Sequence, residues 1–432
     1  MKSKKYINWF MAAIVMVVAG LNFTSCEDEP DKFELTSGGP SIRYVRMSTA
    51  ENADSLVTGA YMDNTICLVG ENLTSIKEMY FNDQKAILNT SFMTKNTLLV
   101  DVPGTIPSTV TNKIYMITNG NDTVNYDFKV LVPGPVISSM SCEWTKPGEE
   151  AQVIGDYFID DPSVPLTLTV GNSNIEIKSF TKNAITFVVP NGLSESPVKI
   201  STIYGTAQSK FNYRDTRGMM FDDWGAGEGG TGLTNHGWHN RDIKNDATSL
   251  DGSYMFMGGA AMTADGAWND GNFSFEYWPG DWNTPQGFTG TDIRLSDLVS
   301  FSDFENKALK FEMCIPAENP WMAGAMQVIF SGNDRVTMQT ANNTFFNDGS
   351  GYSRALYRPW TATGSYDTGG KWVTVTLPIA TSFVYNEEGS PASIPLTEKD
   401  FTGLTIFVWG GGVVGTDCEP VIKIDNVRVV PN

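Results

Sequence analysis

Val69-Gly70-Glu71-Asn72-Leu73 has a counterpart 85 residues later in Ile154-Gly155-Asp156-Tyr157-Phe158, and this repeat indicates how the first half of the chain is organised. An offset that stays at 85 to 87 residues over four landmarks indicates two copies of one unit. The sequence therefore predicts tandem domains at residues 39–132 and 133–214. The other landmarks are Thr94 to Leu98 with Thr181 to Ile185, Val102-Pro103 with Val189-Pro190, and Tyr126 to Phe128 with Phe211 to Tyr213.

Each copy has the pattern of a small β-sandwich. Short runs rich in Val, Ile, Thr, Phe and Tyr alternate with clusters of Gly, Asn, Asp and Ser, which is typical of an immunoglobulin-like domain. The turn from Gly70 to Leu73 and the closing strand from Tyr126 to Phe128 resemble the IPT/TIG class of these domains. Gly39-Pro40 and Gly134-Pro135 begin the copies, and proline stiffens the chain there. The pair is expected to act as a spacer without a site of its own.

The N-terminus has the layout of a secretory signal. Three lysines precede an apolar run from Trp9 to Leu21 that is too short for an ordinary membrane span. Phe23-Thr24-Ser25-Cys26 follows and resembles the lipobox of bacterial lipoproteins. The resemblance implies that residues 1–25 are removed and that acylated Cys26 holds the chain at a membrane. An ordinary signal peptide with a structural cysteine is the alternative.

Residues 26–38 are expected to form a flexible tether. The run from Glu27 to Asp31 carries four acids and a proline, so it cannot bury apolar surface. It resembles the export signal that sends lipoproteins of gut Bacteroidetes to the outer face of the outer membrane. A plain spacer is the alternative reading.

Charge and cysteine usage narrow the function classes. The net charge of −19 becomes −22 without the three signal lysines, which argues against nucleic acid and anionic lipid headgroups as partners. The four cysteines after Cys26 show no CxxC spacing, so we expect no zinc site. They lie in apolar runs and are expected to be free thiols, with one or two disulfides as the alternative: Cys67, Cys142, Cys314 and Cys418. No cofactor is predicted.

The composition changes at Asp215. Nine of the eleven tryptophans lie in residues 215–432, together with glycine-rich loops and strand-like runs of period two. The segment is expected to be one large jelly roll or β-sandwich, so the whole mature chain is predicted to be all-β.

Tryptophan beside Pro, Gly, Asn and Asp is typical of loops that bind sugars. An indole ring can stack on the apolar face of a pyranose, while polar groups meet the hydroxyl rim. The other tryptophans have a structural reading as well. Trp372 alternates with Val and is expected in the core, whereas Trp144 is expected at a domain seam. Either a place in the core or a contact with the ligand fits the remaining three, which are Trp224, Trp238 and Trp409. The candidate binding residues are Trp268, Tyr277, Trp278, Trp282, Trp321 and Trp360.

The overall plan resembles the surface glycan-binding lipoproteins of gut Bacteroidetes, of the second type, which ends in a xyloglucan-binding-type domain. The lipoprotein start, acidic tether, tandem spacer domains and Trp-rich end match in order. The resemblance implies a non-enzymatic protein, lipid-anchored on the extracellular face of the outer membrane. It would capture a neutral polysaccharide of the β-glucan class, such as xyloglucan, for a transporter complex and surface hydrolases.

Two other functions remain open on the sequence. A hydrolase of sandwich fold needs a pair of carboxylates, and Asp222, Asp223, Glu228, Glu276 and Asp281 lie in aromatic-rich loops. They lack a recognisable catalytic motif, and the two histidines, at positions 236 and 239, lack a nucleophile partner. An adhesive surface protein is the other alternative, since loop aromatics also dominate protein interfaces.

Overall fold

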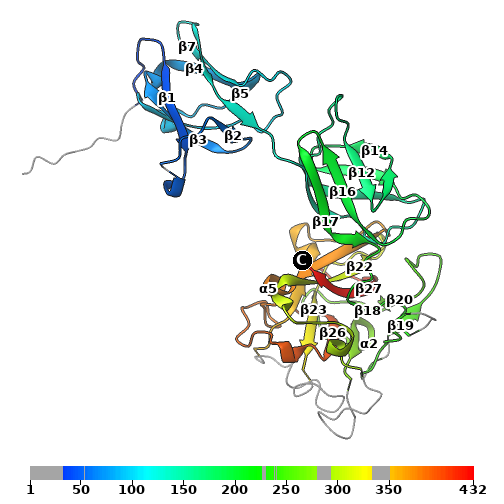
Figure 1. Cartoon of the computed structure of the whole chain (residues 1–432). Coiled ribbons are helices and arrows are strands. Elements are labelled where there is room, and N and C mark those ends of the chain that lie inside the picture. Colours follow the sequence, from blue (N-terminus) through cyan, green and yellow to red (C-terminus); the bar gives the residue numbers. More distant parts are fainter. Residues whose placement is uncertain are drawn as a thin grey trace, which may run out of the picture. The chain divides into compact units, whose positions relative to one another are not determined.

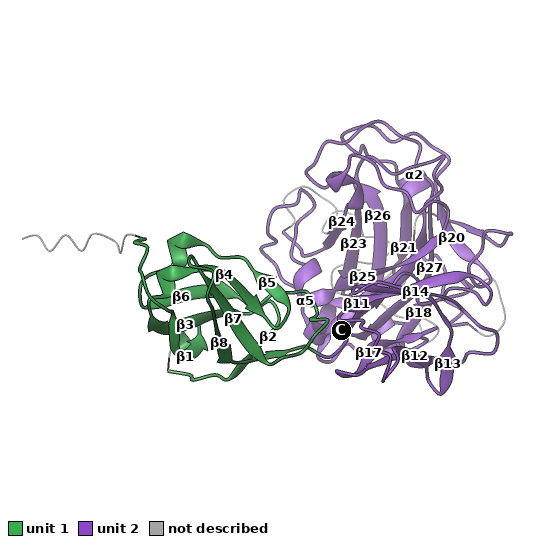
Figure 2. Cartoon of the chain, turned by 90° about the horizontal axis from the view of Figure 1, so that it is seen from above, with its two compact units in different colours: residues 1–133 green, residues 134–432 purple. Residues whose placement is uncertain are grey.

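The computed structural model describes residues 33–52, 54–225, 230–237, 239, 241–279, 293–332 and 351–432. The chain divides into two compact units, residues 1–133 and 134–432 (Figures 1 and 2). The prediction of an all-β chain made of sandwiches is confirmed, because strands form the sheets and the helices among the described residues are single turns. Within the described ranges, no helix is long and apolar enough to cross a membrane. The predicted signal and Cys26 lie outside the described residues.

The first unit is a sandwich of short strands. Sheets of order β1-β3-β6 and β5-β4-β7-β8 enclose a core that includes Leu68, Leu98 and Ile114, while β2 pairs with β9. The strands are β1 (Ser41–Met47), β2 (Gly59–Tyr61), β3 (Thr65–Glu71), β4 (Ile76–Phe81), β5 (Gln84–Ala86), β6 (Thr97–Asp101), β7 (Lys113–Thr118), β8 (Thr123–Asp127) and β9 (Lys129–Leu131). Three single-turn 3-10 helices join them: η1 (Ala50–Asn52), η2 (Leu73–Ser75) and η3 (Thr90–Phe92).

The second unit begins with another small sandwich. Its sheets have the orders β10-β11-β15-β14 and β13-β12-β16-β17, and Val153, Ile185 and Ile200 lie in the core between them. The strands are β10 (Val136–Met140), β11 (Glu150–Asp156), β12 (Thr167–Val170), β13 (Ser173–Ile175), β14 (Ile177–Phe180), β15 (Ala184–Val188), β16 (Ser196–Thr202) and β17 (Gly205–Tyr213).

The repeated glycine has the same structural role in both copies. Gly70 is the next-to-last residue of β3 and Gly155 that of β11, and each lies beside a register shift in the neighbouring strand. A Cβ at either position would lie 1.8 Å from a carbonyl oxygen of that strand, so only glycine fits the close approach. The two backbone N–H groups donate to the carbonyl oxygens of Asn96 and Asn183, each at 2.9 Å. The repeat in the sequence therefore records a shared backbone constraint.

The C-terminal part of the second unit is a larger sandwich. A six-stranded sheet has the order β19-β20-β27-β22-β25, with β18 also paired to β27, and a four-stranded sheet has the order β21-β26-β23-β24. The strands are β18 (Met219–Phe221), β19 (Asp242–Lys244), β20 (Tyr254–Met257), β21 (Ser274–Tyr277), β22 (Lys307–Cys314), β23 (Ala325–Ser331), β24 (Ala355–Tyr357), β25 (Trp372–Pro378), β26 (Gly403–Trp409) and β27 (Ile422–Pro431). The single-turn helices are α2 (Asp270–Phe273), α3 (Leu295–Leu298), η4 (Phe304–Asn306), η5 (Pro359–Ala362), α5 (Ile379–Ser382) and η6 (Glu398–Asp400).

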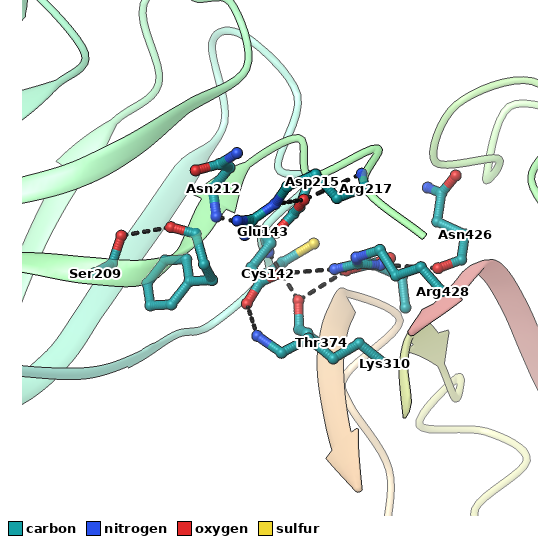
Figure 3. Close-up of polar contacts among 12 residues, drawn as sticks. Cys142, Glu143, Ser209, Asn212, Asp215, Arg217, Lys310, Thr374, Asn426 and Arg428 are labelled. Atoms are coloured by element: carbon teal, nitrogen blue, oxygen red, sulfur yellow. Dashed lines mark hydrogen bonds and ion pairs between the residues drawn. The ribbon is translucent and has the colours of Figure 1, made fainter. Parts of the chain in front are cut away.

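A buried ion network joins the two sandwiches of the second unit (Figure 3). On β22, Leu309 and Phe311 point into the core, whereas Lys310 and Glu312 point to the opposite face. There Glu143, from the first sandwich of this unit, accepts a hydrogen bond from Lys310 Nζ at 2.5 Å. It also accepts one from Nη2 of Arg428 at 2.7 Å. The guanidinium of Arg428 is bound by Glu312 as well, at 2.7 and 3.0 Å.

A small apolar cluster lies beside the network. Trp144 packs with Cys142 and Leu250, which come from the two sandwiches, so the prediction that Trp144 sits at a domain seam is confirmed. Trp372 packs against this cluster and is only half-buried, so its expected place in the core is wrong. The reason is its position on β25, where it points away from the side that buries Val375 and Leu377. The four cysteines after Cys26 are free thiols, and Cys418 is the one that is not fully buried.

Replacement of Arg428 by Met is predicted to destabilise the second unit by about 3 to 5 kcal/mol, because Glu143 and Glu312 would stay buried without a guanidinium partner. Every tryptophan after Trp9 lies in that unit, so the urea midpoint of intrinsic fluorescence reports its unfolding.

Lys178→Met is the control, since it removes an ion pair with Glu150 in which both side chains are exposed. Its midpoint should stay at the wild-type value. A wild-type midpoint for Arg428→Met would contradict the role given to the network.

Candidate functional site

The four-stranded sheet of the C-terminal sandwich has an outer face unlike its inner one. Along β26, Leu404, Ile406 and Val408 enter the core, so the residues between them point outward. The neighbouring strands alternate in the same way. The outward residues are Ser274 and Glu276 on β21, Thr405, Phe407 and Trp409 on β26, and Gln327, Ile329 and Ser331 on β23. We call this side of the sheet the outer face, although all of these side chains except Trp409 are buried.

Three aromatic rings gather at one end of the outer face. The Trp268 ring stands perpendicular to Phe407, with centroids 4.6 Å apart, and to Trp409, with centroids 5.0 Å apart. Phe407 and Trp409 lie nearly parallel, at 19° and 5.8 Å. Trp268 is 45% exposed, whereas Phe407 is buried beneath it. We call these three residues the aromatic platform.

Glycine geometry fixes the loop that carries Trp268. Gly266 has a φ of +66°, and a Cβ there would lie 2.8 Å from Gly324 Cα and 2.9 Å from Gly410 N. The Gly410 N–H donates to the Gly266 carbonyl at 2.9 Å. The loop is thereby attached to the end of β26, directly after Trp409. This contact brings two tryptophans that are distant in sequence into one platform.

A buried polar cluster lies next to the platform. The side-chain oxygen of Gln327 accepts a hydrogen bond from Arg354 Nη1 at 2.7 Å, and its Nε2 donates to the Trp409 carbonyl at 2.8 Å. Arg354 also pairs with Glu387 at 3.3 Å. Desolvation lowers the pKa of Arg354 to about 10, against the opposing effect of Glu387, so the guanidinium stays charged at neutral pH. We call Gln327, Arg354 and Glu387 the polar cluster.

The other end of the outer face is closed by hydrogen bonds. Trp278 Nε1 donates to the Thr405 hydroxyl at 2.8 Å, and this indole is buried. The His236 Nδ1 lies 2.8 Å from the Trp278 carbonyl oxygen. The His239 Nδ1 lies 3.0 Å from Glu276 Oε1. Both histidines therefore lie along the edge of β21, where the backbone of His236 forms an isolated parallel β-bridge with Tyr277.

The structure separates the predicted binding residues. Trp268 is exposed on the platform, and Trp278 lies on the outer face but is buried. Tyr277, Trp321 and Trp360 belong to the hydrophobic core, so the expectation that their rings face solvent is wrong. Burial costs these side chains little free energy, because the hydroxyl or indole N–H of each donates a hydrogen bond to a backbone carbonyl. The acceptors are Ile293 O for Tyr277, Ala323 O for Trp321 and Gly324 O for Trp360. Trp282 lies outside the described residues.

Sequence reasoning missed Phe407 and left Trp409 open. The signal was present in Leu404 to Trp409, since a period of two puts Phe407 and Trp409 on one face and Ile406 and Val408 on the other. Gln327 was missed too, although a single amide in the apolar run of β23 marks an outward position.

The acids considered for hydrolysis serve the loops instead. Asp222 accepts hydrogen bonds from the N–H groups of Asp223 and Thr231, each at 2.9 Å, and Glu276 binds His239. Glu228 and Asp281 lie outside the described residues. Among the residues that the structure describes, no three His, Cys, Asp or Glu side chains gather as metal ligands would.

Comparisons with known proteins match this architecture. Residues 213–431 match the family model of the surface glycan-binding protein B xyloglucan binding domain, and residues 135–216 match the IPT/TIG domain model. The surface glycan-binding protein PbSGBP-B from Prevotella bryantii has a crystal structure that is 43% identical, with a TM-score of 0.71. That alignment covers 92% of this chain and 100% of the Prevotella chain.

A curated relative is more distant. An IPT/TIG domain-containing protein of Bacteroides ovatus is 26% identical over 217 residues, which are 46% of this chain. The chain spans only 43% of that relative's length. The family resemblance seen in the sequence is confirmed, because a family model matches half of the chain and a solved relative aligns over its whole length. The chain belongs to the family of surface glycan-binding proteins of the B type.

Proposed function

We propose that the aromatic platform, at the exposed end of the outer face, binds a neutral β-glucan of the xyloglucan class, and that the protein holds this polysaccharide at the cell surface without cleaving it. The observation that carries the proposal is the exposed Trp268 ring on the aromatic platform, beside the polar cluster. The description of the matching family model as a xyloglucan binding domain supports the ligand class. The similarity to a surface glycan-binding protein of Prevotella bryantii supports the role.

The arrangement suits a sugar chain in two ways. The indole of Trp268 offers a flat apolar surface on which the C–H face of a pyranose can stack. The hydroxyl rim needs partners once it is desolvated, and Asp265 and Asn269, on the same loop as Trp268, have solvent-accessible side chains. A neutral ligand is also unaffected by the protein's negative charge of −19.

Placement at the cell surface is the second part of the proposal. Acylation of Cys26 would anchor the chain in the outer membrane, with residues 26–38 as tether and the two small sandwiches as spacers. Membership in a surface glycan-binding family supports this location. The captured polysaccharide would be passed to an outer-membrane transporter and to surface hydrolases.

A hydrolytic role has less support. The matching family model and PbSGBP-B are described as glycan-binding. Of the acids in the aromatic-rich loops, Asp222 is bound by loop backbone and Glu276 by His239. We therefore expect no reducing sugar to appear when the protein is kept for hours with xyloglucan.

Replacement of Trp268 by Ala is predicted to weaken xyloglucan binding about tenfold. A stacked sugar ring covers roughly 60 Å² of apolar indole, and about 25 cal/mol per Å² gives about 1.5 kcal/mol. Isothermal titration of the mature chain with soluble xyloglucan measures the change.

Phe180→Ala is the matched control, because Phe180 is 44% exposed on β14, in the other sandwich of the same unit. Its affinity should equal that of the wild type. Wild-type affinity for Trp268→Ala would exclude the platform as the binding surface.

Replacement of Gln327 by Met is predicted to weaken binding indirectly, because this side chain is fully buried and cannot contact the ligand. The change removes the hydrogen bond that holds the Trp409 carbonyl and the acceptor for Arg354, so the platform loses its fixed geometry. Near-ultraviolet circular dichroism should change along with the affinity for xyloglucan.

Two further variants separate positioning from general damage. Gln327→Glu keeps an acceptor for Arg354 but cannot donate to Trp409, so its affinity should also fall. Gln208→Met, at an exposed position on β17, should leave both signals unchanged. If Gln327→Met binds like the wild type, the polar cluster does not position the platform.

A further inference from the structure

A cleft opens between the two sandwiches of the second unit, away from the outer face. It has a volume of about 680 Å³, which lies in the usual range of ligand sites. One wall comes from residues 141–152, the loop before β11 and the start of that strand. The other wall comes from the loop at residues 247–249 and the turn at residues 368–373, which enters β25. We call it the seam cleft.

Hydrogen bonds across its base keep the walls of the seam cleft in place. The Thr374 N–H donates to the Ser141 carbonyl at 3.0 Å. The Thr374 hydroxyl accepts a hydrogen bond from the Glu143 N–H at 2.8 Å. Lys146 Nζ reaches across to the Ser249 carbonyl at 2.6 Å. Glu143, which makes one of these contacts, also belongs to the ion network with Arg428 (Figure 3). A ligand would meet a preformed site and would lose little affinity to ordering of the walls.

The seam cleft contains a fixed aromatic ring. The Trp372 indole N–H donates to the Thr248 carbonyl at 2.9 Å, and its ring contacts the edge of Tyr254 at 5.8 Å and 71°. The ring is only half-buried and lines the seam cleft. Trp372 is thus a partly exposed indole held in one orientation, as Trp268 is on the aromatic platform.

Most of the remaining lining residues are polar, and their charges balance. Lys146 and Lys371 oppose Glu149 and Glu150, so the lining side chains carry no net charge. Hydroxyl and amide groups of Ser141, Thr145 and Gln152 complete it. Neutral polar groups around an aromatic ring favour a neutral, hydroxyl-rich ligand, whereas an anion would need an excess of cations.

We propose that the seam cleft is a second glycan site, which takes a short neutral oligosaccharide segment against Trp372. This inference rests on the proposed function for the ligand class, but it concerns a different surface. A polysaccharide long enough to occupy both the outer face and the seam cleft would gain avidity through its second contact.

The test is isothermal titration of the mature chain with a xylogluco-oligosaccharide. We expect two oligosaccharides per wild-type chain. The double variant Trp268→Ala/Trp409→Ala should bind one, at the seam cleft, and Trp372→Ala should bind one, at the outer face.

Because Trp372 also packs against Trp144 and Leu250, a second variant blocks the seam cleft without removing a contact. Ala247→Arg places a long side chain at an exposed lining position and should also reduce the stoichiometry from two to one. Ala380→Arg, at an exposed position on α5, is its control and should keep two.

The outcomes distinguish the two sites. One oligosaccharide per wild-type chain, lost in the Trp268→Ala/Trp409→Ala variant, overturns the seam site and leaves the proposed function intact. One oligosaccharide that survives in this variant and is lost in both Trp372→Ala and Ala247→Arg supports the seam site and overturns the role of the platform. No binding in the wild type overturns both.

Discussion

The strict alternation of side chains along each strand is the constraint on which the C-terminal sandwich depends. Two sheets bury their inner faces against each other, so the same strands must present two outer faces. On the six-stranded sheet, the outward Lys310, Glu312 and Arg428 are covered by Glu143 of the neighbouring sandwich. On the four-stranded sheet, the outward residues carry the aromatic platform. The first outer face thus joins the two sandwiches, and the second supports the exposed ring of Trp268 at one end.

The fold could be predicted because its signals are local in sequence. Positions 70 and 155 are both glycine because a backbone contact there excludes any side chain. The repeated glycine can therefore be recognised in the sequence. Strand runs of period two and the absence of long helical patterns gave the all-β class. The sequence did not reveal that the small sandwich at residues 135–216 and the larger sandwich form one compact unit. The ion network between them joins Glu143 to Arg428, which lie far apart in the sequence.

The sequence predicted the type of candidate site but not which aromatic residues form it. Tryptophan enrichment indicated a sugar-binding surface, but the choice of rings depends on contacts that the sequence does not display. Trp321 and Trp360 look like loop residues beside Pro, yet each donates its indole N–H to a nearby carbonyl and is buried. Trp268 is exposed because the contact between Gly266 and Gly410 attaches its loop to the end of β26. Register and loop contacts therefore select the functional ring from many similar ones.

Hydroxyl-radical footprinting of the mature chain, with and without xyloglucan, would show whether the aromatic platform binds the polysaccharide. The method reports the solvent exposure of each aromatic side chain in one experiment. Our account predicts that Trp268 and Trp409 become protected, while the exposed Tyr61 of the first unit keeps its reactivity. Bound xyloglucan that leaves Trp268 and Trp409 as reactive as in the free protein would contradict it.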